Sequence, residues 1–545
     1  MKTVQYERKV YKTMLEWKEK LAPHHALFLK GARRVGKTTL AEKLGREAYK
    51  TYILVRFDQA GDDVKDLFIN SLRDLDNFYA VLQLLYRTYL HERESLIILD
   101  EIQLFPQARQ AVKTLLEDGR YDILETGSLA SITKRSKEIL IPSEEYTLEV
   151  LPMDFEEFLW AQGDRMTVPL IRRHYETMKP LKDLHRPIMK SFREYMMVGG
   201  MPQAVKMFVE SRDYGKVDLV KQQIINLYSN DMAEQTDERS EYVSNFFFRI
   251  PSELSKHDKR YIISHIQSNA RIREYQGPIR WLDEAMIINI ANCVDEPSAA
   301  LNLSMSDPSF KCYLMDTGLL ISLAFKDRPI LENDLYKQIL LDRLQVNEGM
   351  LIENLVSQCL RANGHPSYFY LERNSATRKT TLEIDFLIRQ NKKIVPIIVS
   401  VIAMLTVICI SSFTREKPPK KQNDINNIAA LSSKATADTL ESDEEMRGVW
   451  VSYMELSMEN ESSKTQKAFE DKFTEIAQKC RESGFNTLIV QVRPFCDALY
   501  KSSYFPWSHI LTGTQGENPQ YDALQIMCDI CKENNLKIHA WINPY

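Results

Sequence analysis

The segment that most constrains this chain is Gly31-Ala-Arg-Arg-Val-Gly-Lys-Thr38, a glycine-containing stretch between two different apolar patterns. The continuous apolar run before it, residues 26–29, predicts a buried strand, and the amphipathic run after it, residues 39–44, predicts a helix. A loop with this spacing between a strand and a helix is typical of a phosphate-binding loop. The sequence therefore predicts an α/β domain built around a nucleotide-binding P-loop.

The residue types in this loop fit a nucleoside triphosphate bound with Mg²⁺. Gly31 and Gly36 allow backbone N–H groups to curl around the β-phosphate, and Lys37 reaches the β- and γ-phosphate oxygens. The hydroxyl of Thr38 can ligate Mg²⁺. We therefore predict ATP and Mg²⁺ as cofactors, with a nucleotide-binding set of Gly31, Arg34, Val35, Gly36, Lys37, Thr38, Thr39 and Ser128.

A second apolar run, residues 95–99, ends in the two acids Asp100 and Glu101. An apolar strand that ends in an acid places that acid at the carboxyl edge of a parallel sheet, beside the phosphates. Asp100 would hold Mg²⁺ together with Thr38, and Glu101 would orient or deprotonate the attacking water. We assign catalytic roles to Glu101 and Lys37. The alternative is that the two acids are simply solvated at the end of a strand.

A third run, residues 121–128, ends in small polar residues. A small polar side chain at this strand end can sense the γ-phosphate, and Ser128 or Thr126 is the candidate. The alternative is an ordinary turn.

The phosphate-binding loop is one of seven stretches that share residues with a single protein family. The stretches are Gly31 to Thr39, Leu99-Asp-Glu-Ile-Gln103, Thr126-Gly-Ser128, Leu151-Pro-Met-Asp-Phe-Glu-Glu-Phe158, Arg193-Glu-Tyr-Met-Met-Val-Gly-Gly-Met-Pro202, Lys311-Cys-Tyr-Leu-Met-Asp-Thr-Gly-Leu319 and Glu383-Ile-Asp-Phe386. Through them, residues 1–393 resemble prokaryotic AAA-superfamily ATPases that carry a C-terminal domain of unknown function. The resemblance implies an N-terminal helix (1–22), an AAA-like P-loop ATPase domain (23–160), a helical and winged-helix-like region (161–330) and a truncated endonuclease-like region (331–393). The sequence assigns neither an arginine finger nor an oligomeric state.

The endonuclease-like region lacks part of the nuclease signature that this resemblance implies. Such folds gather metal ions with a helix glutamate, a strand aspartate and a following Glu-x-Lys. Glu353 and Asp385 stand in matching contexts, but Ile398 and Ser400 occupy the last two places. Isoleucine cannot ligate Mg²⁺ and serine cannot supply a cation, so we expect no nuclease activity.

The charge of the chain gives only local support for a nucleic-acid partner. Its net charge of −4 attracts no nucleic acid overall, so any contact must be local. The region 256–281 is basic and could place a helix on DNA phosphates, with a solvated helix face as the alternative. Its cations are Lys256, Lys259, Arg260, Arg271, Arg273 and Arg280.

Residues 394–413 form a run of twenty residues without a charge, with lysines before it and basic residues after it. At about 1.5 Å per residue this run can span a hydrocarbon core of about 30 Å. We therefore predict a transmembrane or signal segment, followed by a flexible linker at residues 414–445. Basic residues on both sides leave its orientation open.

The last part of the chain, residues 446–545, alternates predicted strands and helices in the order strand, helix, strand, helix, strand. That order begins a parallel (β/α) barrel. The stretches Arg447-Gly-Val-Trp450, Gln491-Val-Arg-Pro494 with Asp497 and Tyr500, Pro506-Trp507, Leu511-Thr-Gly513 and His539-Ala-Trp-Ile-Asn-Pro-Tyr545 resemble the opening of the glycosyl-hydrolase-like ten family. The resemblance implies an envelope protein. We expect only a partial barrel, because a closed one needs eight strands.

Glycosidase activity is not expected from this last part. Arg493, Asp497, His539 and Asn543 could line a sugar cleft in a whole domain, but glycoside hydrolysis needs a positioned pair of acids, and we identify none.

The two resemblances meet near Lys393, as in a fusion of two genes or an error of assembly. The favoured function is an ATP-binding, ATP-hydrolysing AAA-superfamily protein, with DNA as a candidate partner, fused to a membrane segment and a partial barrel. The alternative is an envelope-anchored, carbohydrate-related fragment.

We predict that residues 394–413 hold the chain in a membrane, with the ATPase in the cytoplasm and residues 414–545 outside. Protease added to intact spheroplasts should then remove the C-terminal part and spare the ATPase. Recovery of the full-length protein in the soluble fraction without detergent would contradict this topology.

Overall fold

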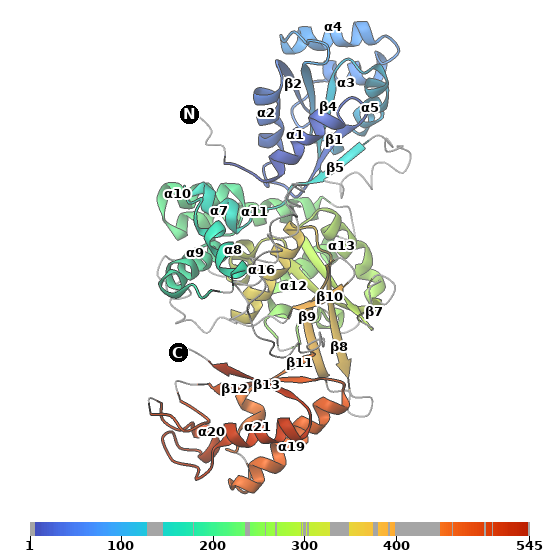
Figure 1. The fold of residues 1–545 in the computed structure, drawn as a ribbon. Coiled ribbons are helices and arrows are strands. Elements are labelled where there is room, and N and C mark those ends of the chain that lie inside the picture. The colour runs from blue at the N-terminus through green and yellow to red at the C-terminus, as the bar shows by residue number, and fades with distance from the viewer. Residues whose placement is uncertain are drawn as a thin grey trace, which may run out of the picture. The chain divides into compact units, whose positions relative to one another are not determined.

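The computed structural model (Figure 1) describes most of the chain, which divides into two compact units, Met1–Pro419 and Lys420–Tyr545. The described residues are 6–127, 145–177, 179–234, 240–256, 258–266, 270–295, 297, 301, 305–326, 348–373, 380–390, 393–397, 447–459, 461–494, 497–503 and 505–542.

The first sheet of the larger unit is fully parallel and has the strand order β2-β3-β4-β1-β5. Its strands are β1 (Ala26–Lys30), β2 (Thr51–Arg56), β3 (Ser95–Asp100), β4 (Asp122–Gly127) and β5 (Glu145–Glu149). Strand β4 lies between β1 and β3, so the ends of the three strands predicted to carry the site are neighbours. The predicted α/β P-loop fold of the N-terminal part is confirmed.

Helices cover both faces of this sheet, which explains why its central strands read as continuous apolar runs. Leu27 and Leu29 of β1 share a core with α1 and α2, whereas Phe28 packs in a second core with α3, α4 and α5. The helices are α1 (Val10–Lys20), α2 (Lys37–Ala48), α3 (Asp62–Asn70), α4 (Leu75–Tyr86) and α5 (Pro106–Asp118), and the 3₁₀ turn η1 (Ile102–Leu104) follows β3.

A helical region follows the first sheet. Its elements are α7 (Phe155–Ala161), α8 (Thr167–Glu176), η2 (Lys182–Leu184), α9 (His185–Val198), α10 (Pro202–Ser211), α11 (Tyr214–Ala233), α12 (Ser240–Leu254), η4 (Ile263–His265) and α13 (Ile272–Glu284). Helix α7 begins with a capping box, in which Asp154 accepts a hydrogen bond from the Glu157 N–H and Glu157 accepts one from the Asp154 N–H.

The second sheet has the order β10-β9-β8-β6-β7 and mixes parallel and antiparallel pairs. The elements of this part are β6 (Ile288–Val294), β7 (Met305–Leu314), α14 (Thr317–Ala324), α16 (Glu348–Ala362), β8 (Ser367–Arg373), β9 (Thr380–Gln390) and β10 (Lys393–Ile397). Strands β6 and β7 form the antiparallel pair expected of a wing. They do not form a free wing, because β6 also pairs with β8.

The predicted start of the membrane segment is wrong. Residues 394–397 belong to β10, which pairs antiparallel with β9, with Ile397 opposite Phe386. Backbone groups in this stretch are therefore bonded to a neighbouring strand. The rest of the predicted segment, residues 398–413, and the predicted linker, residues 414–445, lie outside the described residues. Within the described part of the chain, no helix combines the length and the apolar character needed to cross a membrane.

The smaller unit contains a three-stranded parallel sheet in the order β11-β12-β13. Its elements are β11 (Gly448–Val451), α18 (Tyr453–Leu456), α19 (Gln466–Glu482), β12 (Thr487–Arg493), α20 (His509–Thr512), α21 (Ala523–Glu533) and β13 (Lys537–Ile542). The three strands and the two long helices between them match the predicted order.

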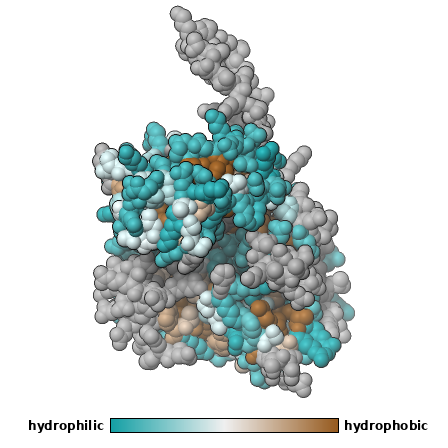
Figure 2. Space-filling model, turned by 90° about the horizontal axis from the view of Figure 1, so that it is seen from below, coloured by the Kyte–Doolittle hydropathy of each residue, from teal (hydrophilic) through white to brown (hydrophobic). Residues whose placement is uncertain are grey.

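Figure 2 shows one face of the molecule, on which hydrophilic residues dominate the described surface and hydrophobic residues gather in small patches. Among the large apolar side chains of the smaller unit, Trp450, Met454 and Ile542 are exposed. Apolar side chains exposed singly are common on protein surfaces and indicate no particular ligand.

One buried acid in the first sheet stands apart from the predicted site. Glu125 on β4 is fully buried, and no described residue donates a hydrogen bond to either of its carboxylate oxygens. Its nearest cation is Arg109 on α5, whose Nε lies 3.8 Å away. Burial raises the pKa of Glu125 to about 8, with a further rise from Glu145 and a partial opposing effect from Arg109.

This raised pKa predicts a pH-dependent stability. Because the folded protein holds the Glu125 proton more tightly than the unfolded chain does, folding takes up a proton between the ordinary pKa of 4.5 and the folded value of about 8. The free energy of unfolding should therefore fall as the pH rises through this window. Glu125→Gln, which is neutral at every pH, should remove this part of the slope in urea unfolding. The exposed Glu117→Gln on α5 is the control, and an unchanged slope in Glu125→Gln would contradict the prediction.

Candidate functional site

A cavity of about 830 Å³ lies where the phosphate-binding loop meets the carboxyl ends of β2 and β3 and the helices α11 and α13. This volume is in the range of small-ligand sites. The lining includes every predicted loop residue with a polar side chain and both predicted acids: Arg34, Lys37, Thr38, Thr39, Asp100 and Glu101.

The candidate metal site, here called the metal corner, is formed by the carboxylate of Asp100 and the hydroxyls of Thr38 and Thr126. Oδ1 of Asp100 accepts hydrogen bonds from Thr38 Oγ1 at 2.8 Å and from Thr126 Oγ1 at 2.5 Å. Burial raises the pKa of Asp100, and the two hydroxyls oppose that rise. A threonine hydroxyl beside a buried aspartate is a donor set that suits Mg²⁺, a hard cation that prefers oxygen ligands. The residues present therefore fit the predicted metal.

Lys37 lies at the first turn of α2 and is buried. Its Nζ donates hydrogen bonds to the carbonyl oxygens of Gly31 at 2.9 Å and Ala32 at 3.0 Å. Burial lowers the pKa of Lys37, and the nearby charges of Glu101 and Asp100 oppose this effect. The ammonium group is thus held inside the loop, where it can exchange carbonyl oxygens for phosphate oxygens.

Two glycines give the loop its path. Gly36, the residue before α2, has a φ of 99°, which is in the left-handed region that favours glycine. A Cβ on Gly31 would lie 2.3 Å from the carbonyl oxygen of Val150, so only glycine fits there. The loop therefore presents the N-terminal N–H groups of α2 to the cavity, as an anion-binding site requires.

The remaining predicted loop residues divide between cavity and core. Arg34, with a φ of 69°, and Thr39 line the cavity. Val35 is fully buried in the core, so its side chain does not face the nucleotide position. Of the two γ-phosphate candidates, Thr126 contacts Asp100, whereas Ser128 lies outside the described residues.

Glu101 is held in a fixed position by groups that the sequence analysis did not use. It has a φ of 53°, uncommon for a residue other than glycine, its N–H donates to Thr126 Oγ1, and Gln103 Nε2 donates to its carboxylate. Gln103 belongs to the family motif Leu99 to Gln103, which was the only signal for it in the sequence.

Three further residues near the loop come from distant parts of the chain. Arg8 Nη1 donates to the Val35 carbonyl at 3.0 Å, and Tyr228 Oη donates to the Arg33 carbonyl at 2.9 Å. Asp231, one turn after Tyr228 on α11, forms an ion pair with the Arg33 side chain. No local sequence pattern indicates these contacts.

The endonuclease-like region does bring Glu353 and Asp385 together, around a buried lysine. Lys311 Nζ lies 2.8 Å from Glu383 Oε1, 3.4 Å from Asp385 Oδ1 and 3.7 Å from Glu353 Oε2. Burial lowers the pKa of Lys311, but the three carboxylates outweigh that effect and raise it overall, so the side chain is charged. Among the described residues, no group of three His, Cys, Asp or Glu side chains is arranged to hold a metal ion.

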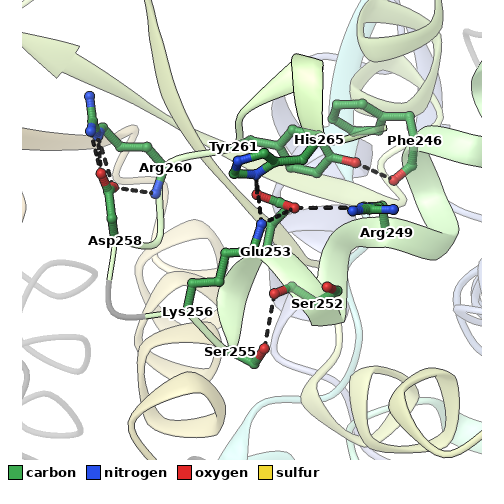
Figure 3. A network of polar contacts seen from close by, with 10 residues as sticks. All are labelled: Phe246, Arg249, Ser252, Glu253, Ser255, Lys256, Asp258, Arg260, Tyr261 and His265. Atoms are coloured by element: carbon green, nitrogen blue, oxygen red, sulfur yellow. Dashed lines mark hydrogen bonds and ion pairs between the residues drawn. The ribbon is translucent and has the colours of Figure 1, made fainter. Parts of the chain in front are cut away.

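In the basic region, internal acids already compensate most of the predicted DNA-binding cations. Figure 3 shows Lys256 beside the buried Glu253, with Nζ 2.6 Å from Oε1, and Arg260 paired with Asp258. His265 and Arg249 also face Glu253.

Of the other four cations in that region, two are paired with acids and two are exposed. Lys259 pairs with Glu353 and Arg280 pairs with Glu284, whereas Arg271 and Arg273 are exposed. Four of the six predicted cations are thus compensated within the protein, and the geometry does not support the predicted DNA surface.

The predicted sugar-cleft residues of the smaller unit are only partly gathered. Asp497 is buried, with Oδ2 3.5 Å from Nδ1 of His509, and the Arg493 guanidinium lies over the Phe505 ring at 4.0 Å. His539 is exposed on β13, and Asn543 lies outside the described residues.

Comparison with known families supports the predicted type of the N-terminal domain. Residues 23–159 match a family model described as an AAA domain. This chain carries an AAA-type ATPase domain. Residues 189–329 match a domain of unknown function, and residues 445–543 match the glycosyl hydrolase-like 10 model. The two resemblances found in the sequence are confirmed, and AAA-type ATPases of this kind bind ATP.

The curated relatives that match this chain are glycosyl hydrolases. Glycosyl hydrolase YngK of Bacillus subtilis (strain 168) is 38% identical over 106 residues, which are 19% of this chain and 21% of that protein. Glycosyl hydrolase DigH of Escherichia coli (strain K12) is 33% identical over 171 residues, which are 29% of this chain and 36% of that protein. The chain thus spans only about a fifth to a third of these relatives.

Solved structures align with a larger share of the chain, but weakly. AMPPCP-bound DnaA from Aquifex aeolicus gives a TM-score of 0.25 at 13% identity and covers 52% of this chain and 88% of that one. The Thermotoga maritima RuvB Holliday junction branch migration motor gives 0.24 at 13% identity and covers 52% and 89%. TM-scores of this size carry no conclusion about function.

The endonuclease-like region is predicted to be inactive as a nuclease. Because Lys311 already neutralises Glu353 and Asp385, purified full-length protein should leave supercoiled plasmid intact with Mg²⁺ or Mn²⁺. Cleavage that disappears in Asp385→Ala but persists in the exposed Glu117→Ala would show that the region is a nuclease.

Proposed function

We propose that the AAA-type domain binds ATP with Mg²⁺ and hydrolyses it. The observation that carries this proposal is that the hydroxyls of Thr38 and Thr126 both donate to Oδ1 of Asp100, while Thr38, Asp100 and Lys37 line one cavity. Three elements distant in sequence supply these groups, and a loop hydroxyl beside a strand-end aspartate is the arrangement that holds the Mg²⁺ of a bound triphosphate.

Each group has a role that follows from its position. Lys37 would move from the loop carbonyls to the β- and γ-phosphate oxygens, where its charge stabilises the charge that develops during transfer. Thr38 and Asp100 would hold Mg²⁺, which supplies Lewis-acid stabilisation of the phosphates. Glu101 would accept a proton from the attacking water or orient it, and Gln103 would keep that carboxylate in place. Thr126 would report the γ-phosphate through its contact with Asp100.

The rest of the chain supports no function as specific as ATP hydrolysis. The compensated charges of the basic region give no particular support to a DNA partner. The alternative function, a carbohydrate-related role at the envelope, rests on the glycosyl-hydrolase-like residues 445–543, which correspond to a minor part of the glycosyl hydrolases they resemble. Membrane anchoring through residues 398–413, the remainder of the predicted segment, is a further proposal.

Two substitutions separate binding from hydrolysis. Lys37→Ala should weaken ATP binding by about tenfold or more, because a charge-assisted hydrogen bond contributes about 1.5–3 kcal/mol. Glu101→Gln should keep ATP binding and lower kcat by about 100-fold, as expected for loss of a general base. Titration with a fluorescent ATP analogue measures the first effect, and phosphate release measures the second.

Lys113→Ala is the matched control for charge, because Lys113 is an exposed lysine on α5, away from the cavity. It should behave as wild type in both assays. Equal ATP affinity in wild type and Lys37→Ala would refute the proposed site.

A further inference from the structure

The side chain of Arg33 reaches out of the phosphate-binding loop and meets the helical region. Its guanidinium forms an ion pair with Asp231 of α11, and its carbonyl oxygen accepts a hydrogen bond from Tyr228 of the same helix at 2.9 Å. Arg33, Asp231 and Tyr228 all line the cavity that holds Lys37 and Thr38. The ion pair therefore spans the edge of the nucleotide site.

The ion pair between Arg33 and Asp231 is partly exposed, so the two side chains can separate. The Arg33 side chain is 47% exposed and that of Asp231 is 20% exposed, so neither is locked in the core. Arg33, Arg34 and Lys37 all line this cavity. Three cations of the loop thus face the same space, and the carboxylate of Asp231 pairs with one of them.

The surroundings of Asp231 are unfavourable for a carboxylate that lacks this partner. Burial raises the pKa of Asp231, Glu234 and Glu101 raise it further, and Arg33 opposes these effects. A bound triphosphate would add negative charge on the same side of the cavity. Asp231 would then lose its partner to the phosphate and face repulsion from the phosphate as well.

We propose that Arg33 binds the γ-phosphate of ATP, and that Asp231 takes the place of that phosphate when no nucleotide is bound. Carboxylate and phosphate offer the guanidinium the same planar pair of acceptor oxygens, so one can replace the other. This inference rests on the proposed ATP binding and adds a residue that distinguishes ATP from ADP. It also makes α11 an element outside the loop that responds to the γ-phosphate.

Helix α11 can carry that response because its other end is anchored by buried polar contacts. Asp218 accepts a hydrogen bond from Ser322 of α14, and Lys221 Nζ donates to the Met197 carbonyl at 2.9 Å. All three polar side chains are buried. Release of Asp231 at one end of α11 therefore acts on a helix whose other end is held by α9 and α14.

Nucleotide affinities of the full-length protein test this inference. Arg33→Ala should weaken binding of the non-hydrolysable triphosphate AMPPNP by about tenfold or more and change ADP binding less than about twofold. Asp231→Asn, which keeps the shape of the side chain, should tighten AMPPNP binding by about threefold to tenfold, because the competing charge is removed. ADP affinity should again change little.

Glu234→Gln is the matched control for Asp231→Asn, because Glu234 lines the same cavity and no described basic side chain pairs with it. Its effect on AMPPNP should be smaller than that of Asp231→Asn. Arg33→Ala that weakens AMPPNP and ADP equally, or Asp231→Asn that weakens AMPPNP, would overturn the inference while ATP binding itself stands. Wild-type protein that binds neither nucleotide would remove the proposed function, and this inference with it.

Discussion

The proposed ATP site depends on one topological constraint, the insertion of β4 between β1 and β3. Pairing of Leu29 with Thr126 on one side of β4, and of Leu99 with Glu125 on the other, fixes where each strand ends. The phosphate-binding loop, Thr126 and Asp100 thereby meet at one edge of the sheet. If β1 and β3 were direct neighbours, no strand would place the Thr126 hydroxyl beside Asp100.

The loop itself is shaped by residues outside the sheet. Arg8, near the start of the chain, and Tyr228, on α11, each donate a hydrogen bond to a loop carbonyl, while Gly31 packs against the backbone of Val150. Arg8 is in turn held by the buried Glu157 of α7. The nucleotide site is thus a property of the whole larger unit, because three separate parts of that unit set the path of eight residues.

Local patterns in the sequence were sufficient to predict the helices and strands but not the contacts between them. The strands that carry Asp100 and Thr126, the helix after the loop and the strand order of the smaller unit were all readable as apolar periods. The contacts of Asp231 and Tyr228 were not, since each joins residues nearly two hundred positions apart.

The acids that pair with Lys256, Arg260 and Arg280 lie within four residues of them in the sequence and were overlooked. Two other errors have a common origin. Lys259 was read as a free charge because its partner, Glu353, comes from another element. Residues 394–397 were read with the apolar run that follows them, but the hydrogen bonds offered by β9 place them in a sheet. In both cases tertiary contacts decided what a local pattern left open.

Lys311 has a consequence for how the second sheet is held together. A metal ion that joined Glu353, Glu383 and Asp385 would exchange with the solution, and its occupancy would follow the metal concentration. Lys311 is a residue of β7, so its ammonium group is always present beside the three carboxylates. The attachment of α16 and β9 to β7 through these ion pairs therefore needs no dissolved cation.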